Sequence, residues 1–129
     1  MATARGSFEV TMAPADGDGA VGPVTTMTLE KTLTGDFVGD GVGSMLAYRT
    51  EVEGSAAYVA LERLTGFLEG LEGGFAAQHT GVMQGGDGQL TITIVPDSGT
   101  GGLTGISGSM TIDVDGAGTH TYVIDYELP

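Results

Sequence analysis

Apolar and polar residues alternate with a period of two through almost the whole chain of 129 residues. This period puts successive side chains on opposite faces of a β-strand, and no segment has the three-to-four-residue spacing of an amphipathic helix. Turn residues, mainly Gly, Asp and Pro, separate the alternating segments. We predict eight strands, over residues 5–12, 24–35, 42–53, 56–70, 73–85, 88–96, 107–115 and 118–128.

Eight consecutive strands joined by short turns are typical of an antiparallel meander. Such a meander can close on itself, which removes the exposed edges at which strands of other chains could add. The 24 glycines fit this interpretation because long strands need turns and bends to curl into a small barrel. We therefore predict an all-β fold, an eight-stranded antiparallel meander that closes into a small barrel, as a single domain over residues 1–129.

The charge balance excludes several classes of partner. The chain has 4 Lys and Arg residues against 17 Asp and Glu residues, a net charge of -13. Nucleic acids and anionic membrane surfaces bind cationic surfaces, so neither is an expected partner. Because the chain has no cysteine, it has no disulfide, thiolate metal site or cysteine nucleophile. The first residues lack the apolar stretch of a secretion signal, and no apolar run is long enough to span a membrane, so we predict a cytoplasmic protein.

The strands predicted over 56–70 and 73–85 carry apolar residues on both faces. One face of each strand can line the barrel, and the other would then be exposed to water. A second subunit would cover such a surface, so we predict a homo-oligomer.

Two motifs near the start of the chain carry no function. Residues 17–22 match the Gly-x-Gly-x-x-Gly pattern of nucleotide-binding loops, but the strand and helix that should flank it are missing. Residues 16–19 resemble the start of a calcium loop, but Met27 stands where the closing glutamate belongs.

His79 and His120 could bind a metal ion together with Glu62, yet their neighbours are mostly apolar, and we favour hydrogen-bonded strand histidines. We therefore predict neither a metal nor a cofactor.

Glu62 is the acidic residue that most needs an explanation, because it shares its strand face with apolar and aromatic residues such as Tyr58. A carboxyl group inside an apolar barrel would have a raised pKa, which suits general acid or base catalysis at neutral pH. His79, expected on the next strand, could act with it, so Glu62 and His79 are the candidate catalytic residues. The alternative is a structural carboxylate paired with one of three cations, Lys31, Arg49 or Arg63.

Several ordered segments, among them residues 6–10, 54–63, 78–83, 95–101 and 120–126, resemble a bacterial domain-of-unknown-function family grouped with the allene oxide cyclase-like barrels. The resemblance implies an eight-stranded antiparallel barrel that is usually oligomeric, and it implies no activity. Allene oxide cyclase and the barrel cyclases that close polyketide rings suggest a use for the lumen. In these proteins a carboxylate or polar hydroxyl groups steer a reactive, mostly apolar substrate.

Three functions follow from these predictions. The first is binding of an apolar or weakly cationic small molecule in a lumen lined by Tyr58, Glu62, His79, His120 and Tyr122. The second is a cyclase or isomerase, with Glu62 as base or steering group and His79 or a tyrosine as proton donor. The third is a structural or interaction protein whose lumen is filled by side chains. A ligand-sized cavity would favour the first two, and a filled barrel with a fully paired Glu62 would favour the third.

Overall fold

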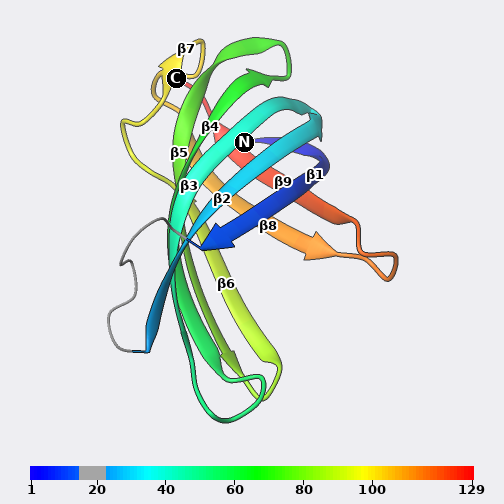
Figure 1. Ribbon diagram of the computed structural model, residues 1–129. Helices are drawn as coiled ribbons and strands as arrows, with labels where there is room; N and C mark the ends of the chain where they lie inside the picture. Colours follow the sequence, from blue (N-terminus) through cyan, green and yellow to red (C-terminus); the bar gives the residue numbers. More distant parts are fainter. Residues whose placement is uncertain (15–22) are drawn as a thin grey trace.

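A computed structural model describes residues 1–14 and 23–129 of the chain, and these residues form one β-barrel (Figure 1). The motifs at residues 16–22 lie outside the described residues. The strands are β1 (Ala2–Pro14), β2 (Val24–Gly35), β3 (Phe37–Arg49), β4 (Ala56–Leu68), β5 (Leu71–Gln84), β6 (Asp87–Ile94), β7 (Thr100–Gly101), β8 (Ser107–Val114) and β9 (His120–Glu127).

All strand pairs are antiparallel, and each long strand pairs with its neighbours in chain order, apart from β7. The barrel closes because β9 pairs back to β1, with Ala2 opposite Tyr126 and Phe8 opposite His120. The predicted all-β barrel of eight antiparallel strands is thereby confirmed. The short strand β7 is an addition that the alternation did not predict, and it pairs with Gly73 and Gly74 at the start of β5. None of the described residues forms a helix that could cross a membrane.

The third strand starts earlier than predicted, at Phe37 instead of residue 42, and it ends at Arg49. A two-residue turn, Gly35-Asp36, joins it directly to β2, and Gly35 has a φ of 96° that favours glycine. The predicted boundary was wrong because the positions of β3 that face the barrel interior after Phe37 are Gly39, Gly41 and Gly43. Glycines have no side chains, so they gave no apolar signal where the strand starts.

One end of the barrel is filled by a continuous apolar core. Phe37 of β3 packs edge-on against Phe75 of β5, with 6.0 Å between the ring centroids. Leu103 and Ile106, from the connection between β7 and β8, are also fully buried in this cluster. This connection and the β4–β5 turn close that end of the barrel in Figure 1.

The outer face of β3 and β4 is apolar and exposed. Its large side chains include Val42, Leu46, Val59, Leu61 and Phe67, which are each between 46% and 60% exposed. The homo-oligomer, which was predicted from the strands over 56–70 and 73–85, stays a prediction.

Tyr122 of β9 connects the β2–β3 turn to the core through hydrogen bonds. Its hydroxyl group donates a hydrogen bond to the carbonyl oxygen of Thr34, at 2.7 Å, and accepts one from the amide of Phe37, at 2.8 Å. The side chain is 1% exposed, so water cannot replace these bonds without a rearrangement of the core.

We predict that Tyr122→Phe lowers the free energy of unfolding by about 1–3 kcal/mol, because it leaves the Phe37 amide without its buried partner. Chemical denaturation followed by circular dichroism measures this change. Tyr48→Phe is the matched control, since Tyr48 is 44% exposed on the outer face of β3. An equal effect of the two substitutions would contradict the role given to the Tyr122 hydroxyl group.

Candidate ligand-binding cavity

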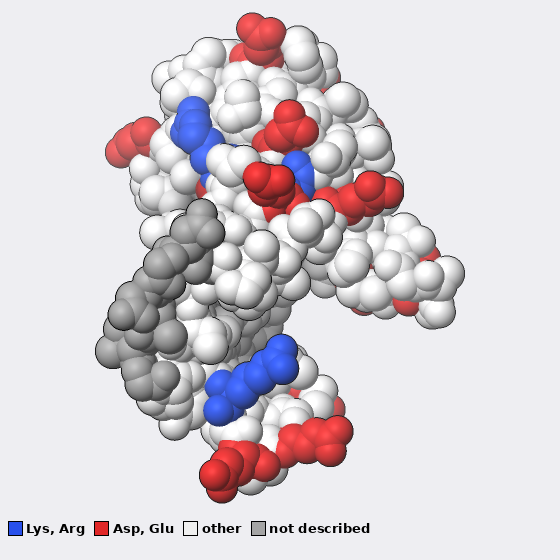
Figure 2. Space-filling model, in the orientation of Figure 1, with Lys and Arg blue, Asp and Glu red and all other residues white. Residues whose placement is uncertain are grey.

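The other end of the barrel is open because the strands part on one side. β6 and β8 pair only at Ile92–Met110 and Thr93–Ser109. β9 reaches β1 only as far as Phe8, so residues 9–14 of β1 pair with β2 alone. The hairpin of β8 and β9 therefore turns away from β6 (Figure 1), and the surface is hollowed below the closed end of the barrel (Figure 2).

A cavity of about 800 Å³ occupies this open half of the barrel. Its wall is mostly apolar, and seven of the strands contribute apolar residues to it, among them Phe8, Val10, Met12, Leu29, Met45, Ala47, Ala60, Met83, Leu90, Ile112 and Val114. Lys31, Tyr58, His79 and His120 add polar groups, and Arg49 and Glu53 also belong to the lining. A volume of this size matches that of cavities that hold small organic molecules.

Three ionisable side chains meet at the floor of the cavity. Oε1 of Glu62 accepts a hydrogen bond from Nε2 of His79, at 2.7 Å, and one from Nζ of Lys31, at 3.1 Å. All three residues are less than 9% exposed. Lys31 and His79 line the cavity, and Glu62 lies behind them, outside the lining. The carboxylate therefore orients the two groups that a ligand would touch.

The glycines of β3 allow Lys31 and Glu62 to meet. Lys31 of β2 pairs with Gly41, and Glu62 of β4 pairs with Gly43, so one whole strand separates the two residues. A Cβ atom at Gly41 would lie 2.9 Å from Leu64 Cδ2, which is closer than real Cβ contacts, and 3.5 Å from Oε2 of Glu62. Because β3 presents no side chains here, the ammonium and the carboxylate can reach each other over its backbone.

The pKa of Glu62 is lower than that of an ordinary glutamate, in contrast to the raised value predicted from the sequence. Burial by itself raises the pKa, but the hydrogen bond from His79 and the positive charge of Lys31 together outweigh it. Glu62 is therefore ionised at neutral pH and cannot serve as a general acid there. Its second oxygen, Oε2, is buried and has no hydrogen-bond partner among the described residues.

Aromatic rings complete the surroundings of this floor. Nζ of Lys31 lies 4.8 Å from the ring centroid of Phe8, a distance at which a cation is attracted to the face of an aromatic ring. The ring of Tyr58 lies beside that of His79, with 6.4 Å between the centroids. Burial, and to a smaller extent the charge of Glu62, raise the pKa of Tyr58, so its hydroxyl group stays protonated and can donate a hydrogen bond.

Three of the five predicted lining residues line the cavity, and two do not. Tyr58, His79 and His120 line the cavity, and Glu62 touches it only through its two partners. Tyr122 does not line the cavity, because its hydroxyl group is hydrogen-bonded in the core to the β2–β3 turn. The described residues contain no cluster of three or more His, Asp or Glu side chains that could hold a metal ion.

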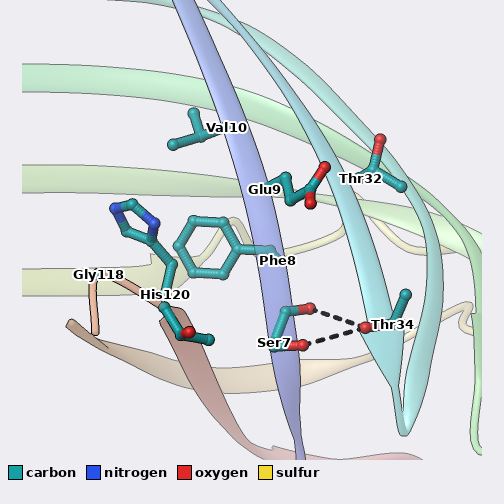
Figure 3. Close-up of a pocket in the computed structure, with 9 residues that line it drawn as sticks. Ser7, Phe8, Glu9, Val10, Thr32, Thr34, Gly118 and His120 are labelled. Atoms are coloured by element: carbon teal, nitrogen blue, oxygen red, sulfur yellow. Dashed lines mark hydrogen bonds between the residues drawn. The ribbon is translucent and has the colours of Figure 1, made fainter. Parts of the chain in front are cut away.

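His120 also borders a second, smaller cavity of about 520 Å³ (Figure 3). This cavity lies between β1, β2 and the turn before β9, and it shares Phe8, Val10 and His120 with the larger one. The rings of Phe8 and His120 lie 5.1 Å apart at the point where β9 stops pairing with β1. These two rings therefore form part of the wall between the two cavities.

Sequence reasoning missed Lys31 and Arg49 as residues of the cavity lining and considered them only as partners of Glu62. The signal for Lys31 was available, because Leu29, Lys31 and Leu33 alternate with polar residues and so share one strand face. Arg63, another proposed partner of Glu62, faces outward and donates a hydrogen bond to Oγ1 of Thr100 at 3.0 Å.

Fold and cavity together define a small closed antiparallel β-barrel with an internal cavity. Residues 4–126 match DUF3224, a family described as proteins of unknown function, and the chain belongs to this family. It is similar to the crystal structure of a protein with unknown function from the DUF3224 family of Shewanella oneidensis MR-1, with 38% identity and a TM-score of 0.92. The similarity covers 100% of this chain and 98% of that one. No curated protein matches the sequence.

We predict that the protein loses stability as the pH falls below 4.5, the ordinary pKa of glutamate, in part because of Glu62. Its pKa is lower in the folded state, so the unfolded chain takes up the proton first, and the stabilising effect is present above 4.5 and lost below it. Glu62→Gln should reduce this pH dependence, measured as the free energy of unfolding between pH 7 and pH 3. Glu30→Gln, on the exposed face of β2, is the control. Equal pH profiles of Glu62→Gln and the unsubstituted protein would contradict the lowered pKa.

Proposed function

We propose that the protein binds an apolar small molecule in the open half of the barrel. The observation that carries this proposal is the cavity of about 800 Å³, with an apolar wall and a few polar groups gathered at its floor. Binding sites for small organic molecules commonly combine a concave apolar surface with a small number of polar groups that orient the ligand. The four polar groups near the floor, on Lys31, Tyr58, His79 and His120, would have that role.

A barrel with a purely structural role is less well supported. Such a barrel would be filled by side chains throughout, whereas only the closed end is filled here. Exposed apolar area has a free-energy cost of roughly 25 cal/mol per Å², so an open apolar lumen needs a functional reason. A bound ligand would remove that area from water.

We predict that an environment-sensitive dye with apolar aromatic rings and one sulfonate group, 1-anilinonaphthalene-8-sulfonate, binds the unsubstituted protein and that uncharged decanol competes with it. Ala47→Phe should weaken dye binding about tenfold or more, because the larger ring occupies space between Met45 and Arg49 in the cavity. Fluorescence titration at pH 7 measures both affinities. Native mass spectrometry of the freshly purified protein adds an independent test, because a co-purified small molecule would appear as a mass adduct.

Ser44→Phe is the matched control for this substitution. It adds the same ring to the same strand, but on the exposed outer face, away from the cavity. Equal weakening by the two variants, or no binding of dye and decanol by the unsubstituted protein, would contradict the proposed function.

The contact between His79 and Glu62 favours a second candidate, an isomerase or cyclase that moves a proton next to a carbonyl group. A carboxylate at 2.7 Å holds the Nε2–H of His79, which fixes the ring and leaves Nδ1 as the basic nitrogen. Nδ1 would take a proton from the carbon beside a substrate carbonyl, and the charge that forms on the carbonyl oxygen would be stabilised by the Lys31 ammonium. With a β,γ-unsaturated carbonyl substrate, loss of this proton gives a dienolate, and return of the proton to the γ carbon gives the conjugated isomer. In this scheme Glu62 positions His79 and is not itself the base.

We predict that the protein accelerates exchange of the protons next to the carbonyl group of 2-decanone for deuterium in heavy water. His79→Gln should remove this acceleration, because an amide is not basic, and proton NMR of the ketone measures the rate. Thr80→Gln, on the outer face of the same strand, is the control. Equal exchange rates with the unsubstituted protein and with His79→Gln would exclude His79 as the base and leave the binding proposal standing.

Three further predictions from the sequence remain proposals. We propose that the barrel is related to the allene oxide cyclase-like barrels, on the resemblance in sequence and on the closed antiparallel meander. We also keep the cytoplasmic location and the homo-oligomer as proposals, and the exposed apolar face of β3 and β4 supports the oligomer.

A further inference from the structure

We infer that the ligand of this cavity carries a single anionic head group of the carboxylate class, which binds the ammonium of Lys31, with an apolar tail that extends toward the mouth. This inference rests on the proposed binding function and adds the charge and the orientation of the ligand. The sequence alone suggested an apolar or weakly cationic ligand, so this inference changes the charge that we predict for the head group.

The first observation is the unused hydrogen-bonding capacity of Lys31. Its side chain is 7% exposed, and its ammonium carries three protons. Among the described residues, one proton is donated to Oε1 of Glu62, and the ring of Phe8 lies 4.8 Å from Nζ. At least one proton is left for the cavity that Lys31 lines. A buried donor without an acceptor costs free energy, which an anionic ligand would recover.

The second observation is the position of Glu62. Its Oε1 already accepts two hydrogen bonds, from Lys31 and His79, and the whole carboxylate lies behind these two residues. A cationic head group at the floor would meet the ammonium of Lys31, because the unpartnered Oε2 of Glu62 is buried and lies outside the cavity lining.

The third observation is the distribution of charge. The chain has 13 more acidic than basic residues. Of its four cations, Lys31 and Arg49 line the cavity, whereas Glu53 is the one acidic residue in the lining among the described residues. Counting Glu62 behind the floor, the cavity has two positive and two negative groups, so it is neutral inside a strongly acidic protein. The groups around the cavity therefore add no net negative charge of their own against an anion, in contrast to the outer surface.

The apolar wall gives the orientation. Lys31 pairs with Gly41, and Arg49 ends the same strand β3 eight residues further on, roughly 25 Å away along an extended strand. Met45, Ala47 and Met83 line the cavity on the side of Arg49. A ligand with its head group on Lys31 would therefore lay its tail along these residues.

We propose to compare three ligands that share a ten-carbon chain and differ in the head group: decanoate, decanol and decyltrimethylammonium. Isothermal titration calorimetry at pH 7, below the micellar concentrations, gives the affinities. We expect decanoate to bind about tenfold to a hundredfold more tightly than decanol, as one charge-assisted hydrogen bond would provide, and decyltrimethylammonium to bind most weakly.

The double variant Lys31→Met with Glu62→Gln tests whether Lys31 is the residue that binds the head group of the ligand. It removes one positive and one negative charge together, so neither charge is left buried alone and the net charge of -13 is unchanged. We expect this variant to bind decanoate and decanol with similar affinity. Arg63→Gln, which removes a cation from the outer face, is the control and should keep the preference for decanoate.

The outcomes separate this inference from the function on which it rests. Binding of decanol as tight as that of decanoate would overturn the anionic head group and leave the apolar binding site intact. A preference for decanoate that survives in the double variant would overturn the assignment to Lys31. Failure of all three ligands to bind the unsubstituted protein would overturn the proposed function itself. The three measurements on the unsubstituted protein decide the head group even where a variant fails to fold.

Discussion

The buried carboxylate of Glu62 is the constraint on which the open half of the barrel depends. A charge at this depth is tolerated only where donors and an opposite charge compensate for the lost water, and Lys31 and His79 supply both. Lys31 can reach Glu62 only because Gly41 and Gly43 leave β3 without side chains between them. The glycines, the ion pair and the imidazole therefore form one unit, and a change in any of them affects the others.

The two halves of the barrel are packed differently, because side chains fill one half and the other half encloses a cavity. At the closed end, large apolar residues and the hydroxyl group of Tyr122 leave no space and satisfy the backbone of the β2–β3 turn. At the open end, β8 and β9 separate from β6 and β1, and the same inward face of the strands becomes the wall of a cavity. This division of the barrel suits binding of a small molecule better than a purely structural role.

The fold could be predicted from the sequence to a large extent, because alternation and turn residues are local signals. The exceptions have physical reasons: β3 starts at Phe37 among inward glycines, which show no period, and β7 has only two residues. The site was harder to predict. Strand parity puts Tyr58 and His79 on inward faces, and both line the cavity, but the direction of the Glu62 pKa shift depends on which side chains face it across other strands. That information lies in the register, which the sequence does not show.

The most direct test of this account is NMR of the single lysine of the chain. Lysine labelled with ¹⁵N gives one side-chain signal, which can only come from Lys31. A buried ammonium held by Glu62 should show an ¹⁵N shift typical of the charged form and protons that exchange slowly enough with water to be observed at neutral pH and low temperature. A signal whose protons exchange as fast as those of free lysine, or a shift typical of the neutral amine, would contradict the ion pair and the account built on it.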